Sequence, residues 1–119
     1  MPKITTPENW VTIFSWHTRN FVGWEDACGL YRVMLHGQLM FIGHAAKGGL
    51  GPRLLALRRP KGAGRKHHAG SLIYQYRAEI TMQIAVLSLP PDDIIHRLAQ
   101  LLDEHRPLWN VPNGHYRDF

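Results

Sequence analysis

The sequence has 119 residues, of which 45 % are hydrophobic and 19 % are charged. These are ordinary values for a globular chain, so they argue against a fibrous or disordered protein, and the length suits one domain rather than two. The formal net charge of +5, with a pI near 9.8, points to an anionic partner.

The first half of the chain predicts a helix, a hairpin and a second helix. In PENWVTIFSW (7–16), apolar residues at positions 10, 13 and 14 predict a short N-terminal helix. CGLYRVML (28–35) and QLMFIGHA (38–45) predict two strands that turn at His36-Gly37. LGPRLLALRRP (50–60) predicts a helix that Pro60 ends, with an apolar face formed by Leu50, Leu54, Leu55 and Leu57.

The second half predicts a loop, a strand and a helix. KGAGRKHHAGS (61–71) reads as a flexible, cationic loop, and YRAEITMQIAVLSL (76–89) alternates as a strand with one buried face. Pro90-Pro91 ends this strand, and Asp92 or Asp93 can cap a final helix over 92–105. Its apolar stripe consists of Ile94, Ile95, Leu98, Leu101 and Leu102. We therefore expect an α+β fold: a small three-stranded, mainly antiparallel sheet flanked by helices, with an extra N-terminal helix.

Cationic residues gather in one part of the chain. Residues 27–78 contain no Asp or Glu but nine of the fourteen Lys and Arg, so this block favours a polyanion such as nucleic acid. A solvated basic loop is the alternative, and a membrane surface is disfavoured because the block is glycine-rich rather than an amphipathic helix. The predicted phosphate contacts are Lys47, Arg58, Arg59, Lys61, Arg65 and Lys66.

The cellular setting is predicted from what the sequence lacks. No apolar run approaches the length of a membrane span, so no membrane partner is expected. The first ten residues contain no apolar segment of a secretory signal, and the single Cys28 cannot form an internal disulfide. Both features predict a cytoplasmic protein.

Four short motifs occur in a fixed order: Gly29-Leu30-Tyr31, Phe41-Ile42-Gly43, Leu50-Gly51-Pro52-Arg53-Leu54 and Pro107-Leu108-Trp109-Asn110. Their order and spacing resemble the GIY-YIG nuclease family over about residues 27 to 112. The resemblance implies a single domain with an N-terminal helical extension (1–26), a GIY-YIG-like core (27–112) and a C-terminal tail (113–119).

The resemblance also implies a phosphodiester-cleaving site that acts on nucleic acid, DNA above all. In the family, the tyrosine of the first triplet activates water and the helix arginine clamps the phosphate, and these roles fall to Tyr31 and Arg53. A family His or Tyr that follows the helix assists proton movement, and His67 or His68 is the nearest match. Further implied nucleic-acid contacts are His44, where the family often has lysine, and Asn110.

Two positions depart from the family pattern. Phe41 stands where tyrosine is common, so the second phenol is missing. Leu98 stands where the family has a metal-binding glutamate, which puts a Mg²⁺ or Mn²⁺ cofactor in doubt because these ions need carboxylate oxygen. Glu79, on the polar face of the third predicted strand, is the remaining candidate ligand. A zinc site from His96 and His105 is disfavoured, because nine residues do not return to one helical face.

Three functions remain open at this point. The first is an active endonuclease that uses Tyr31, Arg53 and a histidine. The second is a catalytically degenerate protein of the same fold that binds DNA or RNA, and the third is a protein-binding adaptor. Leu98 favours the second, the retained tyrosine, arginine and histidines favour the first, and the basic block argues against the third. Each retained residue also has a plain alternative, as a strand aromatic, a surface cation or a loop histidine.

Overall fold

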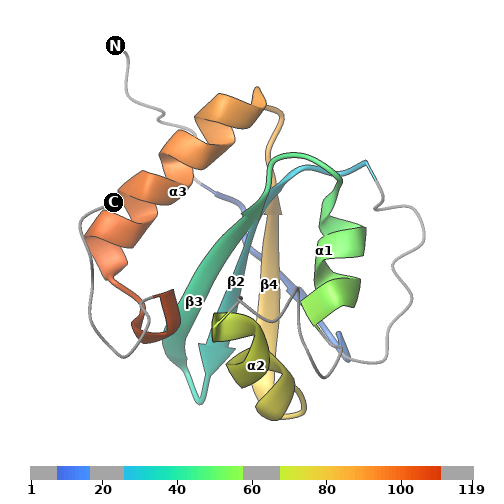
Figure 1. Cartoon of the computed structure of the whole chain (residues 1–119), viewed down its shortest axis with the longest axis vertical. Coiled ribbons are helices and arrows are strands. Elements are labelled where there is room, and N and C mark those ends of the chain that lie inside the picture. The colour runs from blue at the N-terminus through green and yellow to red at the C-terminus, as the bar shows by residue number, and fades with distance from the viewer. Residues whose placement is uncertain (1–7, 17–25, 58–67, 111–119) are drawn as a thin grey trace.

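The structure is a computed structural model that describes residues 8–16, 26–57 and 68–110. The fold is α+β, as the sequence predicts. No helix in the described residues is both long and apolar enough to cross a membrane. In chain order, the elements are β1 (Val11–Ile13), β2 (Gly29–Leu35), β3 (Gln38–Ala45), α1 (Leu50–Leu57), α2 (His68–Gln75), β4 (Ile80–Val86), α3 (Pro91–His105) and the 3-10 helix η1 (Leu108–Asn110) (Figure 1).

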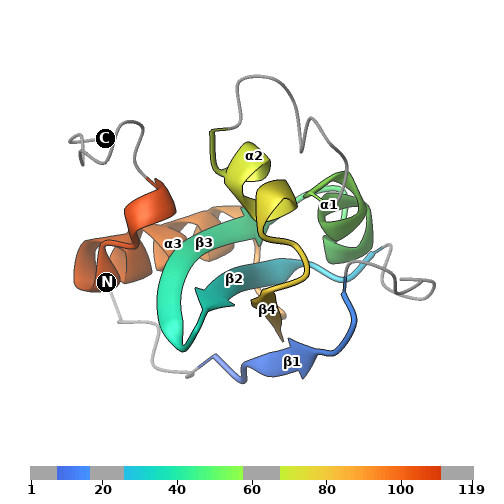
Figure 2. The ribbon, with the colours of Figure 1, turned by 90° about the horizontal axis from the view of Figure 1, so that it is seen from below.

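The four strands form one antiparallel sheet in the order β1-β4-β2-β3. β2 lies inside the sheet, with Tyr31 opposite Gly43 of β3 on one side and Ile84 of β4 on the other. β1 adds three residue pairs to β4. β1 and β3 are therefore the two edge strands (Figure 2).

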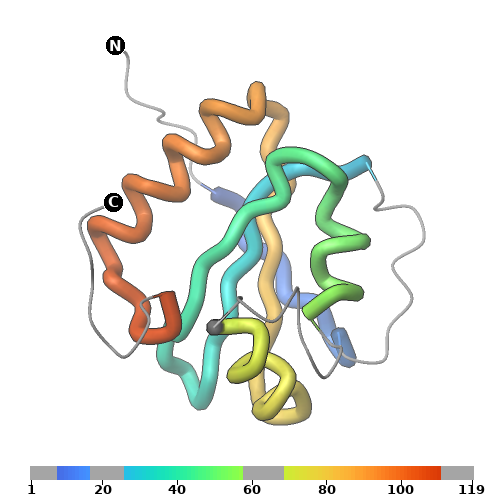
Figure 3. The backbone as a smooth tube through the Cα atoms, viewed as in Figure 1, coloured from blue at the N-terminus to red at the C-terminus, as the bar shows by residue number. Residues whose placement is uncertain are grey.

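The hairpin between β2 and β3 turns at His36 and Gly37, which confirms the prediction (Figure 3). Both residues have positive φ, 50° for His36 and 81° for Gly37. A two-residue turn of this kind matches the right-handed twist of the paired strands, and glycine adopts its second position without strain. The register shifts between Val33 and Met34, where β2 has an irregularity opposite β3.

Helices cover both faces of the sheet. On one face, α1, α2 and η1 bury Leu50, Leu54, Leu57, Ala69, Ile73 and Trp109 against Tyr31, Val33 and Phe41 of the strands. On the other face, α3 buries Ile94 and Leu101 against Leu30 and Ile42. Side chains alternate along a strand, so neighbouring residues of β2 and β3 reach opposite layers. This alternation decides which helix each site residue meets.

The predicted N-terminal helix is wrong, and so is the count of three strands. Residues Val11 to Ile13 form β1, the fourth strand, and a turn follows at 14–16. Val, Thr and Ile are all β-branched, and three in succession are stiff at χ1 and favour an extended backbone. The expected apolar helical face does not exist, because Phe14 is 77 % exposed while Ile13 is buried.

The sequence pattern does not predict α2. This helix begins at His68, inside the segment 61–71 that is predicted to be a loop. Ala69 and Ile73 lie four residues apart and are both buried in the cluster beneath α1 and α2. Isolated helices of this length are marginal, so tertiary packing rather than local propensity explains α2.

The remaining elements follow the predictions with local differences. In β4, Ile80, Met82 and Ile84 are buried as expected, but Val86 is 60 % exposed. In α3, Ile95 does not belong to the buried stripe and is 45 % exposed. The predicted aspartate cap is also wrong: Pro90 is the N-cap residue, and the two aspartates lie in the first helical turn, where negative charge favours the helix dipole.

Candidate functional site

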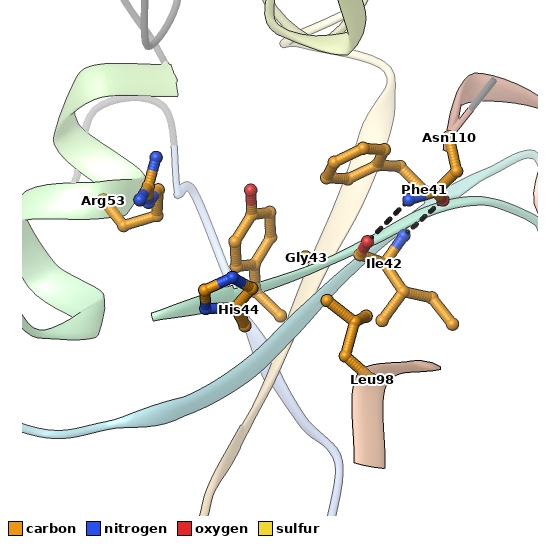
Figure 4. Close-up of a pocket in the computed structure, with 8 residues that line it drawn as sticks. Phe41, Ile42, Gly43, His44, Arg53, Leu98 and Asn110 are labelled. Carbon is orange, nitrogen blue, oxygen red and sulfur yellow. Dashed lines mark hydrogen bonds between the residues drawn. The ribbon is translucent and has the colours of Figure 1, made fainter. Parts of the chain in front are cut away.

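A cleft of about 180 Å³ opens along the edge strand β3. α1 borders it from one layer and α3 from the other, because β3 is exposed at the sheet edge between them. The cleft brings together residues from β2, β3, α1, α3 and η1, many of which belong to the four motifs of the sequence. Its lining consists of Tyr31, Phe41, Ile42, Gly43, His44, Arg53, Leu98 and Asn110 (Figure 4).

Tyr31 lies at the inner wall of the cleft. Its side chain is 2 % exposed, and its ring packs against Phe41 with the ring centroids 5.8 Å apart. Burial raises the pKa of the Tyr31 phenol well above its ordinary value of 10.0, and the positive charge of Arg53 opposes this shift only in part. Tyr31 is therefore a neutral phenol at neutral pH and can donate a hydrogen bond rather than act as a phenolate base.

Gly43 makes the position of Tyr31 possible. A Cβ atom at residue 43 would collide with Cζ and the hydroxyl of Tyr31, so the ring lies directly on the glycine backbone. Gly29 has a comparable role at the start of β2, because a Cβ there would meet the carbonyl oxygen of Ala85. The two glycines of the triplets thus allow close backbone approach, one beside the cleft and one inside the sheet.

His44 follows Gly43 on β3 and is half-buried. The backbone N–H of Ala46 donates a hydrogen bond to Nδ1 of His44 over 3.2 Å. Burial lowers the pKa of His44 below its ordinary value of 6.5, and the charge of Arg53 lowers it further. The imidazole is therefore neutral at neutral pH, with its proton on Nε2, because Nδ1 accepts the hydrogen bond from Ala46.

Arg53 projects from the flank of α1. Leu50, Leu54 and Leu57 occupy the buried face of this helix, which leaves the side chain at position 53 half-exposed at the cleft (Figure 4). Among the described residues, no carboxylate forms an ion pair with Arg53. Its guanidinium is a planar, permanently charged fork of donors, which suits a phosphate or carboxylate ligand.

Asn110 closes one end of the cleft by binding the edge of β3. Its Oδ1 accepts a hydrogen bond from the backbone N–H of Ile42 at 3.0 Å, and its Nδ2 donates one to the Ile42 carbonyl at 2.8 Å (Figure 4). The side chain therefore pairs with β3 much as another strand would, and it attaches η1 to the sheet. Contact between Asn110 and nucleic acid stays a prediction.

Leu98 of α3 lies in the cleft with Tyr31 and Arg53. The position that the family resemblance assigns to a metal-binding glutamate is thus at the site, but it carries an apolar side chain. The residues around the cleft do not fit a Mg²⁺ or Mn²⁺ ion, since none of the eight has a carboxylate and the nearest permanent charge is positive. In the described part of the chain, no group of three or more His, Cys, Asp and Glu could hold a metal ion.

Glu79, the remaining metal candidate, does not line the cleft. It is exposed in the turn before β4, whose first residue, Ile80, pairs with Leu35 of β2. Leu35 is four residues along β2 from Tyr31, a separation of about 13 Å in an extended strand. The structure therefore gives Glu79 no place at the site.

Few of the predicted cationic contacts fall on described residues. Lys47 is exposed in the loop between β3 and α1, directly after the strand that carries His44. His68 begins α2. The remaining predictions, namely Arg58, Arg59, Lys61, Arg65, Lys66 and His67, lie outside the described residues.

Two other arginines of the acid-free block have structural contacts. Arg32 lies over the Trp10 ring at 4.3 Å and donates from Nε to Gln83 at 2.6 Å. Arg77 lies over the Tyr74 ring at 4.1 Å. Such stacking is favourable for a guanidinium and holds both side chains in place. These cations therefore help to pack the sheet and its connections as well as adding positive charge.

Comparison with protein-family models, with curated proteins and with solved structures gives no match to this chain.

Proposed function

We propose that the protein binds nucleic acid by receiving a backbone phosphate in the cleft at the edge of β3, without cleaving the strand by a metal-assisted route. A single observation carries the proposal: Leu98 lies in the same cleft as Tyr31, His44 and Arg53. The donors that would hold a phosphate are present there, whereas the position for a metal ligand is apolar.

The donors in the cleft suit an anion. Arg53 offers a charged fork, His44 offers its Nε2 proton, and the Tyr31 phenol offers a third donor. Among the described residues, no negatively charged side chain lines the cleft to compete for them. Six of the eight lining residues belong to the acid-free block of residues 27–78, whose positive charge attracts a polyanion.

The cleft meets the requirements for phosphodiester hydrolysis less well than those for phosphate binding. Hydrolysis of a phosphodiester needs an activated nucleophile and stabilisation of the charge that develops on phosphate and leaving group. Burial keeps the Tyr31 phenol protonated, and Nδ1 of His44 accepts a hydrogen bond from Ala46. The Tyr31 phenol is thus not a phenolate base, and His44 can accept a proton on Nδ1 only by releasing its hydrogen bond from Ala46. Binding without cutting is therefore the function that this geometry supports best.

An endonuclease remains a second candidate, because Tyr31 and Arg53 line one cleft as the family resemblance implies. In that case, substitution of Tyr31 by Phe would abolish cleavage while leaving the fold and the affinity almost intact. A plasmid-nicking assay with Mg²⁺ or Mn²⁺ distinguishes the two functions. We expect no nicking by the wild type, and metal-dependent nicking that Tyr31→Phe abolishes would establish the endonuclease instead.

The binding proposal is tested with Arg53→Ala and the matched control Arg106→Ala. Arg106 is an exposed arginine after α3 and does not line the cleft. In EDTA, loss of the charged donor at position 53 should weaken oligonucleotide binding by about 1.5–3 kcal/mol, or roughly tenfold to 150-fold. The control should change it little. Equal affinities for wild type and Arg53→Ala would overturn the proposal.

A further inference from the structure

Among the described residues that line the cleft, only His44 has an ordinary pKa near neutrality. From β2 the cleft receives the neutral Tyr31 phenol, and from α1 the permanently charged Arg53. α3 contributes only Leu98 and η1 only the Asn110 amide. None of the described residues that line the cleft has a carboxylate, which could offset a change in the charge of the imidazole.

The position of the imidazole allows one well-defined change on protonation. In the neutral ring, Nδ1 accepts the hydrogen bond from the Ala46 backbone N–H at 3.2 Å. A protonated Nδ1 is a donor and cannot accept from another N–H group. A proton on Nδ1 therefore breaks this hydrogen bond and requires an acceptor elsewhere, and a phosphate beside Arg53 would supply one.

We propose that the cleft takes up one proton together with its phosphate, and that His44 holds this proton on Nδ1. The inference rests on the proposed nucleic-acid binding and adds a dependence on pH to it. The proton comes from solvent, the N–H bond forms on Nδ1, and the hydrogen bond from Ala46 is released. His44 thereby changes from a neutral donor of one hydrogen bond to a cation that is paired with the phosphate.

The sign of the effect follows from the charges at the site. Without a ligand, burial and the charge of Arg53 hold the pKa of His44 below its ordinary value. A bound phosphate offsets the charge of Arg53 and attracts the imidazolium, so the pKa rises in the complex. Above the pKa that His44 has in the complex, affinity does not depend on pH. Affinity then increases as the pH falls from this value to the lower pKa of His44 in the free protein, and below the lower pKa it is constant again.

The test measures the affinity of the full chain for a short oligothymidylate at constant ionic strength. Neither its phosphodiesters nor its bases change charge in the range used, so a dependence on pH reports on the protein. Between about pH 8 and about pH 5.5, the wild type should bind up to about tenfold more tightly for each unit by which phosphate raises the pKa of His44. His44→Gln, which keeps an N–H donor but does not titrate, should lack this part of the gain.

Controls separate His44 from the other histidines. His96→Gln and His105→Gln, both at exposed positions of α3, should retain the full dependence on pH. An undiminished dependence in His44→Gln would overturn the inference. Wild-type binding that does not change with pH would also overturn it while leaving the proposed function intact, and absence of binding at every pH would refute the proposed function itself.

A second readout reports directly on the proton. In ¹⁵N NMR spectra, the Nδ1 signal of His44 and the amide signal of Ala46 should titrate together, since one hydrogen bond joins them. Saturation with oligothymidylate should move their common midpoint to higher pH. An unchanged midpoint in the bound protein would contradict the uptake of a proton by His44.

Discussion

Placing a carboxylate at Leu98 should convert the cleft from an anion site into one that depends on a divalent metal. Residue 98 and the proposed phosphate share one cleft of about 180 Å³, so for a Leu98→Glu variant we use a charge separation on the order of 7 Å. Two negative charges at about 7 Å repel by about 2 kcal/mol at an effective dielectric constant of about 20, and salt reduces this to about 1–2 kcal/mol. Leu98→Glu should therefore weaken oligonucleotide binding in EDTA by about fivefold to thirtyfold.

The matched control is Leu98→Gln, which has nearly the same shape as Leu98→Glu and no charge. Both variants lose the apolar contacts of Leu98 with the cluster beneath α3, at a cost of about 1–3 kcal/mol in the free energy of unfolding. Only Leu98→Glu should also lose affinity in EDTA and recover it when Mg²⁺ is added.

The assay is fluorescence anisotropy in EDTA and in Mg²⁺, with urea unfolding to confirm that both variants are folded. Nicking by Leu98→Glu in Mg²⁺, beside a silent wild type, would in addition identify a degenerate nuclease. If Leu98→Glu bound as tightly as Leu98→Gln in EDTA, the phosphate could not lie in this cleft.

Three further predictions concern the glycine beneath the tyrosine, the N-terminal segment and the basic block. Gly43→Ala should displace Tyr31, lower the free energy of unfolding by about 1–3 kcal/mol and weaken oligonucleotide binding; unchanged stability would refute the close approach. Glu8→Gln should cost about 1–2 kcal/mol at neutral pH, because the side chain of Glu8 pairs with Arg97, and urea unfolding measures this loss. If about five cations of the block contact phosphates, the logarithm of the binding constant should fall against the logarithm of salt concentration with a slope of roughly −4 to −5 on duplex DNA. Affinity that ignores salt would exclude the block as the contact surface.

The stability that the Glu8–Arg97 pair contributes should depend on pH. The hydrogen bond from Arg97 holds the pKa of Glu8 below its ordinary value of 4.5, although burial opposes this shift. A lowered pKa in the folded state stabilises the protein above pH 4.5, and this contribution disappears as the pH falls through the lowered value. The difference between wild type and Glu8→Gln should therefore shrink in acid. A difference that stays constant into strongly acidic solution would show that packing, not charge, connects Glu8 to α3.

Much of the fold could be predicted because its signals are local. The β2–β3 hairpin follows from two apolar runs around His36-Gly37, and α1 and α3 follow from apolar residues at helical spacing. β1 and α2 could not be found in this way. β1 has only three residues and is defined by its pairing with β4, about seventy residues further along the chain. α2 depends on the burial of Ala69 and Ile73 against distant elements.

The family resemblance anticipates that some of the predicted residues lie together, but it does not anticipate how their side chains interact. Tyr31 and Arg53, from two of the motifs, line one cleft with His44 and Leu98, as the family resemblance implies. The sequence carried no signal that the Ala46 amide binds His44, since this depends on the path of the backbone after β3. It also left the distance from Glu79 to the cleft undefined, because that distance depends on strand register.

The most direct test of nucleic-acid binding at the β3 edge is an NMR titration of the ¹⁵N-labelled protein with oligonucleotide in EDTA. The side-chain Nε signal of Arg53 and the backbone amides of Gly43 and His44 should shift in proportion to the bound fraction. The amides of His96 and Asp103, on the exposed side of α3, should stay in place. Binding accompanied by shifts elsewhere in the protein, with the signals of Arg53, Gly43 and His44 unchanged, would contradict the account.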